Sequence, residues 1–297
     1  MGFEDGLVGF EPLPGGWSGE TFLAETASER SVVRIFAAPH HRSEAPEIQA
    51  ALHQLVRGLV PVPAVKEVRR RRDADAPGLL VTEHLPGVRG DLLLADLDAG
   101  DRARVGAVAG EVAATLAGMA TLRSGTWADA DLRIAPYEIS LPGWVEDHAA
   151  ALARHGWSAA DLGALGSLAA EADPLLLAVG RTCVVHSDLN PKNLLFDPST
   201  LRVTGVVDWE YSHSGHPWTD VGNLVRVEGD TAFNEAVLCQ WRERHGGDRS
   251  TLLSGARAAD LVALVELAAR AEENPVAEAA AVRLRAAVAD PAGYLTG

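Results

Sequence analysis

The sequence predicts an α+β protein built in two parts, a small strand-rich part followed by a larger helical one. The first ninety residues contain short apolar runs separated by turn residues, a pattern typical of strands. From Asp101 onward, Ala-rich segments with helical spacing dominate. The charge divides at the same place, because residues 1–90 carry 10 Lys and Arg against 12 Asp and Glu, and residues 91–297 carry 16 against 29. We therefore expect two domains, residues 1–90 and 91–297.

Four strands and one helix are expected in the first part. The helix covers Pro46–Arg57, where Ile48, Leu52 and Leu55 recur at helical spacing. The strands are rich in Val, Leu and Ile and are bounded by turn residues: Thr21–Thr26, Ser31–Ala37, Val62–Arg70 and Gly78–Leu85. The first part is thus a small sheet that carries one helix.

The second part is expected to be mainly helical, interrupted by a pair of strands around Val184 and Val203. Ser158 and Asp161 have the spacing of a capping box at a helix start. The expected helices are Asp101–Leu122, Ser158–Ala172, Thr231–His245, Thr251–Glu273 and Pro275–Asp290.

Composition limits the compartment and the partners. The chain has 297 residues, is 47% hydrophobic and carries a net charge of −15, which argues against nucleic acid and favours cationic partners. It shows neither a signal-peptide pattern nor an apolar run of about 18 residues, so we expect no membrane contact. Cys183 and Cys239 lie far apart and outside metal-type spacing, as expected of free thiols in the cytoplasm.

The stretch VVHSDLNPKNLLFD carries the chemistry. His186, Asp188 and Asn193 fit the pattern H-x-D-x-x-x-x-N, in which the Asp accepts a hydroxyl proton and the Asn holds a metal ion. A plain loop can match this pattern by chance. A second acid, Asp208, follows the apolar strand VTGVV a short hairpin later, where a divalent cation needs an anionic oxygen ligand. Together the two segments predict a proton acceptor beside a site for a divalent cation.

On these motifs the chain resembles the aminoglycoside phosphotransferase and choline kinase-like family, small-molecule kinases with a protein-kinase-like fold. The resemblance covers nearly the whole chain and implies a bilobal α+β fold: an antiparallel N-terminal sheet lobe with one helix, and a larger helical lobe. It also implies a nucleotide-binding hairpin in LPGGWSGETFLAE, although a plain surface hairpin is the competing interpretation. The phosphate-binding glycines and serine are Gly15, Gly16, Ser18 and Gly19.

The resemblance assigns further nucleotide contacts in the first part. Arg34 takes the place of the phosphate-gripping cation of the third strand, and its partner carboxylate is Glu47, with Glu44 as the alternative. The backbone around Glu83, His84 and Leu85 is the hinge that would bind an adenine or guanine edge, so both ATP and GTP stay open as the donor.

Departures from the protein-kinase pattern favour a small acceptor. Ser187 stands where protein kinases carry the Arg that contacts a phosphorylated activation loop, and Trp209 and Glu210 follow Asp208 in place of Phe and Gly. No A-P-E segment follows. We therefore expect an enzyme that needs no activation-loop phosphorylation.

Several residues allow two interpretations. His186 is expected to be a hydrogen-bonded scaffold residue, and Asp220 matches a family acid that braces the catalytic loop but could equally be a helix N-cap. Lys192 could touch the γ-phosphate or be a solvated loop lysine. His213 and His216 have a spacing seen in zinc sites, yet we expect structural support. The run 69–72 is expected to be a solvated hairpin tip.

Three classes of function remain. A kinase that inactivates a cationic antibiotic comes first, because a polycation profits from the acidic second part. A kinase for a metabolite such as choline, a sugar or an amino acid is the alternative, and a pseudokinase is third. General surface solvation would equally explain the acidity. The carboxylates expected to contact a cationic acceptor are Glu210, Asp230, Glu272 and Glu273.

Overall fold

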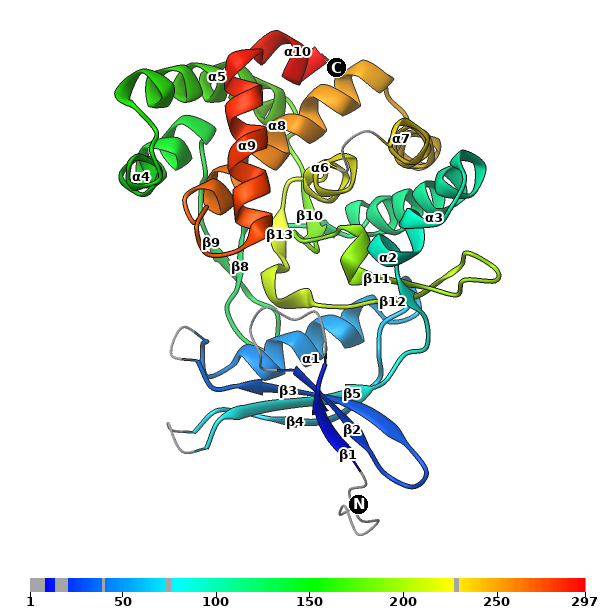
Figure 1. Cartoon of the computed structure of the whole chain (residues 1–297). Coiled ribbons are helices and arrows are strands. Elements are labelled where there is room, and N and C mark those ends of the chain that lie inside the picture. The colour runs from blue at the N-terminus through cyan, green and yellow to red at the C-terminus, as the bar shows by residue number, and fades with distance from the viewer. Residues whose placement is uncertain (1–8, 14–20, 39–40, 73–75, 227–229, 297) are drawn as a thin grey trace. The chain divides into compact units, whose positions relative to one another are not determined.

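The computed structural model describes residues 9–13, 21–38, 41–72, 76–226 and 230–296 (Figure 1). The chain forms two compact units. The first comprises residues 1–96, 126–135 and 191–212, and the second comprises residues 97–125, 136–190 and 213–297. The expected α+β class is confirmed. The expected division at residue 90 stays a prediction, because each unit is assembled from separate stretches of the chain.

The first unit contains an antiparallel five-stranded sheet with the order β1-β2-β3-β5-β4. Its central strand, β3, pairs with β2 through Arg34 and Thr21 and with β5 through Arg34 and Leu80. Four of these strands coincide with predicted ones to within a few residues, whereas β1 was not predicted, because GFEP offers no apolar run. The strands are β1 (Gly9–Pro12), β2 (Thr21–Glu25), β3 (Arg30–Phe36), β4 (Val65–Arg69) and β5 (Gly78–Glu83).

Helix α1 (Ala45–Val56) lies against one face of this sheet (Figure 1). It matches the predicted helix, with Pro46 in the first turn, where a missing N–H costs nothing. Ile48, Leu52 and Val56 recur at helical spacing and are buried. The remaining face of α1 carries Glu47 toward the end of β4, a placement that matters for the candidate site.

A second, three-stranded sheet of the first unit has the order β12-β11-β6. β11 (Leu194–Phe196) and β12 (Val203–Val206) form an antiparallel hairpin, and β6 (Val88–Arg89) pairs on the far side of β11. Helix α2 (Gly90–Ala95) follows β6 directly. The two strands predicted around Val184 and Val203 are both present, but they do not pair with each other, because Val203 pairs with Phe196 in its own hairpin.

Val184 belongs to β10 (Thr182–Val185) in the second unit. This strand pairs with β7 (Ala120–Thr121) on one side and with β13 (His213–Gly215) on the other. The same sheet continues through β8 (Gly125–Trp127) to β9 (Ile134–Pro136). These strands are too short to show alternation in the sequence, which is why β10 alone was predicted.

The second unit is otherwise helical, and the predicted helices are present. The expected capping box is confirmed, since Ser158 and Asp161 bond reciprocally at the start of α5. Three helices were missed, α4, α6 and α10, which begin beside Pro or lack a strong apolar stripe. The helices are α3 (Ala99–Ala117), α4 (Leu141–Arg154), α5 (Ala159–Leu177), α6 (Thr219–Val225), α7 (Thr231–His245), α8 (Arg249–Ala268), α9 (Pro275–Ala289) and α10 (Pro291–Thr296).

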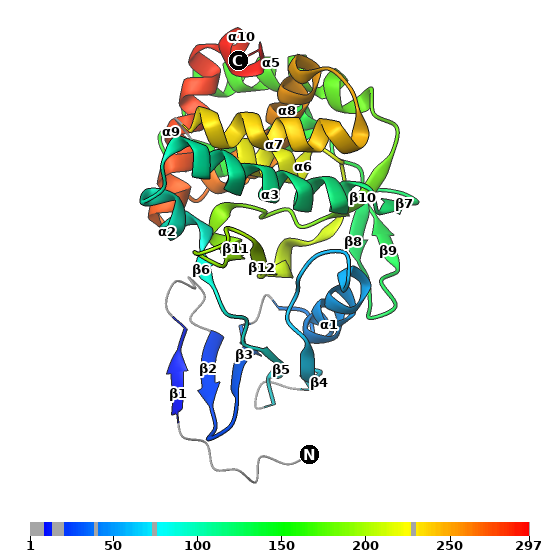
Figure 2. The same ribbon diagram turned by 90° about the vertical axis from the view of Figure 1, so that its right-hand side faces the viewer.

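Helices α3 and α7 lie side by side at close range (Figure 2). Glycines on α3 allow the approach, because a Cβ on Gly106 would lie 2.4 Å from the carbonyl oxygen of Phe233, and one on Gly110 would lie 2.7 Å from that of Val237. A side chain there would force the helices apart. The glycines of α3 therefore set its distance from α7.

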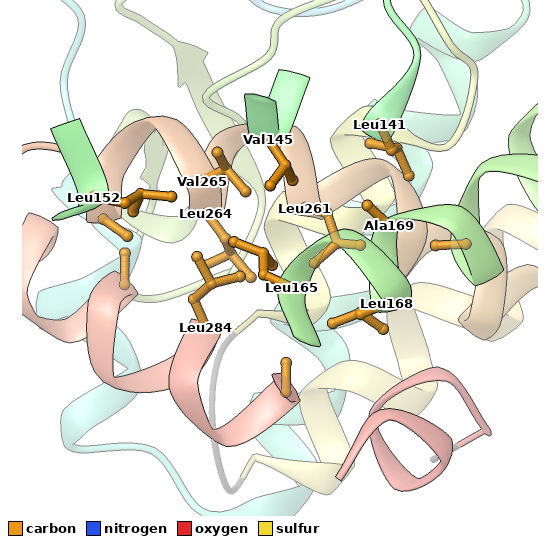
Figure 3. Packing of buried hydrophobic residues seen from close by; sticks show 14 of the residues in the cluster. Leu141, Val145, Leu152, Leu165, Leu168, Ala169, Leu261, Leu264, Val265 and Leu284 are labelled. Carbon is orange, nitrogen blue, oxygen red and sulfur yellow. The ribbon is translucent and has the colours of Figure 1, made fainter. Parts of the chain in front are cut away.

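A core cluster of the second unit joins α4, α5, α8 and α9 (Figure 3). Leu152, Leu165 and Leu284 are fully buried in it, and α8 contributes Leu261 and Val265. Each such side chain stabilises the fold by roughly 1.5–3 kcal/mol relative to an exposed one. None of the described helices is both long and apolar enough to cross a membrane.

Candidate active site

Asp188 lies on a tight loop that follows β10 in the second unit. Ser187, directly before it, has a φ of 68°, a left-handed conformation that is strained for a residue with a side chain. The N–H of Asp188 donates to Nδ1 of His186 at 3.3 Å. Asn190 Nδ2 donates both to the carbonyl oxygen of Asp188 at 3.1 Å and to its Oδ1 at 2.7 Å. The carboxylate of Asp188 is thus held in one orientation by a residue that sequence reasoning missed.

The carboxylate of Asp220 holds the same loop through two hydrogen bonds from its backbone. Its carboxylate accepts the N–H of His186 at 2.9 Å and the N–H of Ser187 at 2.8 Å. Burial raises the pKa of Asp220, and the charge of His186 together with the two N–H bonds opposes that rise. The bracing interpretation of Asp220 agrees with these bonds. The N-cap interpretation is wrong, because α6 begins at Thr219 with Trp218 as its N-cap.

Asn193 and Asp208 lie at one end of the β11–β12 hairpin in the first unit. β11 and β12 pair at Leu194 and Val206, and one step further the N–H of Val207 donates to the carbonyl oxygen of Asn193 at 3.0 Å. Asp208 comes next and has a φ of 66°. The two predicted metal ligands therefore lie at the same end of two adjacent strands, β11 and β12. The backbone of Asp208 adopts a left-handed conformation at that end.

This donor set suits Mg²⁺. Asn193 offers an amide oxygen and Asp208 a carboxylate, both hard oxygen donors. Two protein ligands are what such an ion takes when phosphate oxygens and waters supply the rest of its octahedron. In the described ranges no group of three or more His, Cys, Asp or Glu is arranged to hold a metal.

Arg34 points from β3 toward the same end of the hairpin. Its Nη1 donates to Oδ1 of Asp208 at 2.7 Å, and its Nη2 donates to Glu210. Only 11% of the Arg34 side chain is exposed. Burial lowers the pKa of Arg34, but the charges of Asp208 and Glu210 outweigh burial and hold the pKa above its usual value. The structure therefore brings together Arg34 and Asp208, the predicted phosphate-binding cation and a predicted metal ligand.

Glu47, the predicted partner of Arg34, contacts a different arginine. Its Oε2 accepts Nε of Arg70 at 2.7 Å, and Glu44 lies 3.6 Å from the same guanidinium. The prediction that Glu47 pairs with Arg34 is wrong in this structure, because α1 directs Glu47 toward the residue that follows β4. The run 69–72 is correspondingly more than a solvated tip, since Arg71 also donates to the carbonyl oxygen of Ala38 at 3.0 Å.

The predicted hinge is already partly used by the sheet. The N–H of Glu83 donates to the carbonyl oxygen of Ala64 at 2.8 Å, and that of His84 donates to Arg30 at 3.4 Å. Among the described residues, the N–H of Leu85 is the one of the three not donated to a main-chain carbonyl. Of the three predicted hinge residues, Leu85 is therefore the one whose N–H remains a candidate donor to a nucleotide base. The predicted phosphate loop, Gly15, Gly16, Ser18 and Gly19, lies outside the described residues.

Two of the four carboxylates expected to face a cationic acceptor are engaged elsewhere. Asp230 is the N-cap of α7, accepts the N–H of Phe233 at 3.0 Å and pairs with Arg102 at 3.4 Å. Only 7% of Asp230 is exposed, so the expectation that it contacts a cationic acceptor is wrong. Glu210 pairs with Arg34, so the expectation that Glu210 contacts a cationic acceptor is also wrong. Burial raises the pKa of Glu210, and the Arg34 charge opposes that rise.

Glu272 and Glu273 lie on an open hollow of about 530 Å³ in the second unit. The Glu272 carboxylate lies 3.9 Å from Nδ1 of His155. Both residues are exposed, whereas Asp230 is buried.

The remaining candidates have local roles. His213 lies against Tyr137, with ring centroids 6.0 Å apart, and Nδ1 of His216 accepts the N–H of Trp218 at 3.2 Å. These contacts agree with structural support. Lys192 is half-buried in the short 3₁₀ helix Pro191–Asn193 and has partners within the protein.

The fold and these loops define a class, the small-molecule phosphotransferases with a protein-kinase-like fold. The chain belongs to the phosphotransferase enzyme family APH, whose family model matches residues 9–252. Among curated proteins, an acyl-CoA dehydrogenase family member 11 of Mus musculus is 48% identical over 42 residues, which is 14% of this chain and 5% of that protein. An aminoglycoside 3′-phosphotransferase of Streptomyces fradiae is 34% identical over 87 residues, which is 26% of this chain and 32% of that protein. The chain thus spans a minor part of these relatives.

Solved structures show the same fold along almost the whole chain. A putative aminoglycoside phosphotransferase of Ralstonia eutropha JMP134 has a TM-score of 0.69 at 18% identity and covers 99% of this chain and 94% of its own. The aminoglycoside phosphotransferase APH(4)-Ia, in a ternary complex with ADP and hygromycin B, has a TM-score of 0.64 at 18% identity, covering 97% and 95%. The choline kinase LicA of Streptococcus pneumoniae has a TM-score of 0.65 at 15% identity, covering 95% and 94%.

Proposed function

We propose that this protein transfers the γ-phosphate of ATP, or of GTP, to a hydroxyl group of a small molecule in a Mg²⁺-dependent reaction. The observation that carries the proposal is the way Asp188 is held. Asn190 fixes its carboxylate, and Asp220 pins the two residues before it. A strained loop with so many directed bonds is what a proton acceptor needs, since the acceptor must meet the hydroxyl in one orientation.

Asp188 accepts the proton of the acceptor hydroxyl. A carboxylate is a weak base for an alcohol, so the proton moves late, as the bond to phosphorus forms. Asn190 fixes the orientation of the Asp188 carboxylate by donating to its Oδ1. His186 takes no part in the proton transfer, because its Nδ1 accepts the N–H of Asp188 and its ring is fully buried.

Arg34, Asn193 and Asp208 bind the nucleotide phosphates. Asn193 and Asp208 would hold Mg²⁺, which supplies positive charge to the β- and γ-phosphate oxygens. Arg34 adds a permanent cation whose planar fork suits two phosphate oxygens. The N–H of Leu85 is the hinge donor for the base, and Gly15, Gly16, Ser18 and Gly19 are proposed to approach the phosphates with their backbone N–H groups.

A cationic antibiotic is the proposed acceptor, and phosphorylation would inactivate it. Support comes from the net charge of −15, most of it carried after residue 90, and from the exposed carboxylates Glu272 and Glu273. The relative from Streptomyces fradiae and the hygromycin B complex are proteins named for aminoglycosides. A cytoplasmic place is in keeping with the free thiols Cys183 and Cys239.

A metabolite kinase is the second candidate. The likeness to the choline kinase LicA favours it. The ion pairs of Asp230 with Arg102 and of Glu210 with Arg34 also favour it, because they leave fewer carboxylates for a polycation. The two candidates differ in the charge of the acceptor and in the salt dependence of its KM, because exposed ion pairs are screened.

The test is a screen of nucleotide turnover against aminoglycosides, cationic peptides, choline, sugars and amino acids. Asp188→Asn should bind nucleotide as the parent does and lower turnover with the best acceptor by roughly a hundredfold or more. Asp147→Asn, an exposed change on α4, is the matched control and should turn over normally.

The outcomes separate the candidates. A polycation whose KM rises steeply up to about 0.5 M salt, while the nucleotide KM moves little, supports the antibiotic kinase. A neutral or anionic best acceptor replaces it with the metabolite kinase. Full turnover in Asp188→Asn removes Asp188 from its role, and failure to turn over any acceptor makes the protein a pseudokinase.

A further inference from the structure

Arg34 is held by two carboxylates that come from one short segment of the chain. Nη1 donates to Asp208 at 2.7 Å and Nη2 to Glu210, so each end of the guanidinium has its own acceptor. All of these residues belong to the first unit. Charge-assisted bonds to both ends of a buried fork fix its plane as well as its position.

Helix α1 offers no such partner. Its Glu47 is committed to Arg70 at 2.7 Å, and its Glu44 lies 3.6 Å from the same arginine while also accepting the hydroxyl of Ser43 at 2.6 Å. The carboxylates that the sequence suggested for Arg34 are thus bound to Arg70, which directly follows β4. The carboxylates that orient Arg34 are therefore Asp208 and Glu210 and do not come from α1.

The position of Glu210 is set by the residue before it. Trp209 is fully buried, its indole N–H donates to the carbonyl oxygen of Val206 at 3.0 Å, and its ring lies 6.4 Å from that of His53 on α1. The short 3₁₀ helix Trp209–Tyr211 therefore starts from an anchored side chain. A quarter of the Glu210 side chain is exposed, and its Oε2 accepts Nη2 of Arg34.

We propose that Glu210 is the positioning residue of Arg34, the carboxylate that keeps this guanidinium aimed at the nucleotide phosphates. The inference rests on the proposed function. Asp208 is needed as a metal ligand, so when its carboxylate serves that role, Glu210 is the acid that still holds Arg34. The D-W-E segment then supplies both a metal ligand and the partner of the phosphate-binding cation, and α1 supplies neither.

Equilibrium binding of Mg-ADP, measured by calorimetry, tests the inference apart from turnover. Glu210→Gln keeps the size of the side chain but removes its charge, and it should weaken Mg-ADP binding by roughly tenfold. Glu67→Gln, an exposed change on β4, is the matched control and should bind as the parent does. Glu47→Gln tests the rival assignment and should shift the affinity by less than about twofold.

A double-mutant cycle shows whether Glu210 acts through Arg34. Arg34→Gln should itself weaken binding, and adding Glu210→Gln to it should change little more, because the second residue would have nothing left to orient. A merely structural role of Glu210 would give the same loss in both backgrounds and overturn the inference. The melting temperature of each variant identifies loss through unfolding, and Glu210→Asp provides a conservative rescue.

Each outcome has a separate meaning. If the parent protein does not bind Mg-ADP, the proposed function fails. If the parent binds and Glu210→Gln binds equally well, or if Glu47→Gln carries the loss instead, the proposed function stands and Glu210 is not the positioning residue.

Discussion

The carboxylate of Asp220 accepts the backbone N–H of Ser187 at 2.8 Å, although the two residues are 33 positions apart in the chain. Ser187 sits in a left-handed conformation directly before Asp188. A bond from a buried acid to a strained backbone is what allows that conformation to persist. The geometry of Asp188 therefore depends on a residue of α6 that never meets a substrate.

Asp220→Asn should lower kcat at least tenfold and destabilise the fold by roughly 1–3 kcal/mol. An amide presents its own N–H toward one of the two donors, His186 or Ser187, and leaves that donor unpaired. Steady-state kinetics and urea unfolding measure the two effects. Asp173→Asn, which changes another carboxylate that accepts a backbone N–H, is the comparison, since its bond to Leu141 lies away from the loop. Equal kcat losses in both variants would contradict the bracing role.

Gly106→Ala should destabilise the protein by roughly 1–3 kcal/mol, because the added methyl group would meet the backbone of Phe233 where α3 and α7 touch. Gly163→Ala is the matched control on α5, where nothing lies within 4 Å of the added carbon. That change should instead stabilise by up to about 1 kcal/mol through helix propensity. Thermal unfolding of the two variants checks the opposite signs, and a stabilised Gly106→Ala would show that the helices can separate at no cost.

The two cysteines should react at very different rates. Burial raises the pKa of Cys183 to about 12 and encloses its Sγ in β10, whereas Cys239 is exposed on α7. A thiol reagent such as DTNB should modify one thiol quickly in the native protein and two in denaturant, because the thiolate is the reactive form. Cys239→Ser should abolish the fast reaction, and a fast native reaction in that variant would show that β10 is open to solvent.

Acid should destabilise the protein through His216. Burial lowers the pKa of His216 to about 4, below the ordinary value of 6.5 that it regains on unfolding. Between these values the unfolded chain binds a proton that the folded chain excludes, so the free energy of unfolding falls as the pH drops from about 6.5 to 4, by up to roughly 3 kcal/mol.

His216→Asn keeps an acceptor for the N–H of Trp218 and removes the titration. Its free energy of unfolding, measured by denaturant titration across this pH range, should vary less than that of the parent. Parallel curves for the two proteins would mean that His216 is protonated in the folded state as easily as in the unfolded one.

Much of the fold could be predicted from local patterns. The alternation in SVVRIFA predicted β3, and the spacing of Ile48 and Leu52 predicted α1. Both predictions succeed because a buried strand face or helix stripe gives a hydrophobic period within a few neighbouring residues. The short strands β7, β8 and β13 could not be predicted in this way. Two or three residues contain no full period, and their hydrogen bonds come from partners far along the chain.

The candidate site divides along the same line. The spacing of Asp188 and Asn193 and the position of Asp208 after an apolar strand are sequence features, and the family of small-molecule phosphotransferases follows from them. Asn190 is also visible in the sequence, two residues after Asp188. Its role in orienting Asp188 could be recognised only from the hydrogen bond that its Nδ2 donates to Oδ1 of Asp188. The sequence named the acids Glu47 and Asp230 by type and place, and it had no means of showing which cations and N–H groups they already serve.

The sequence by itself therefore determined the residue types that we propose for phosphoryl transfer and their order along the chain. Only the tertiary structure decided their partners: Arg34 with Glu210 across 176 positions, Ser187 with Asp220 across 33, and Asp230 with a helix end and Arg102 rather than with an acceptor. The physical reason is that one carboxylate satisfies any nearby cation or N–H equally well in chemical terms. Its choice depends on which groups packing places within about 3 Å and shields from water, and that is a property of the folded chain.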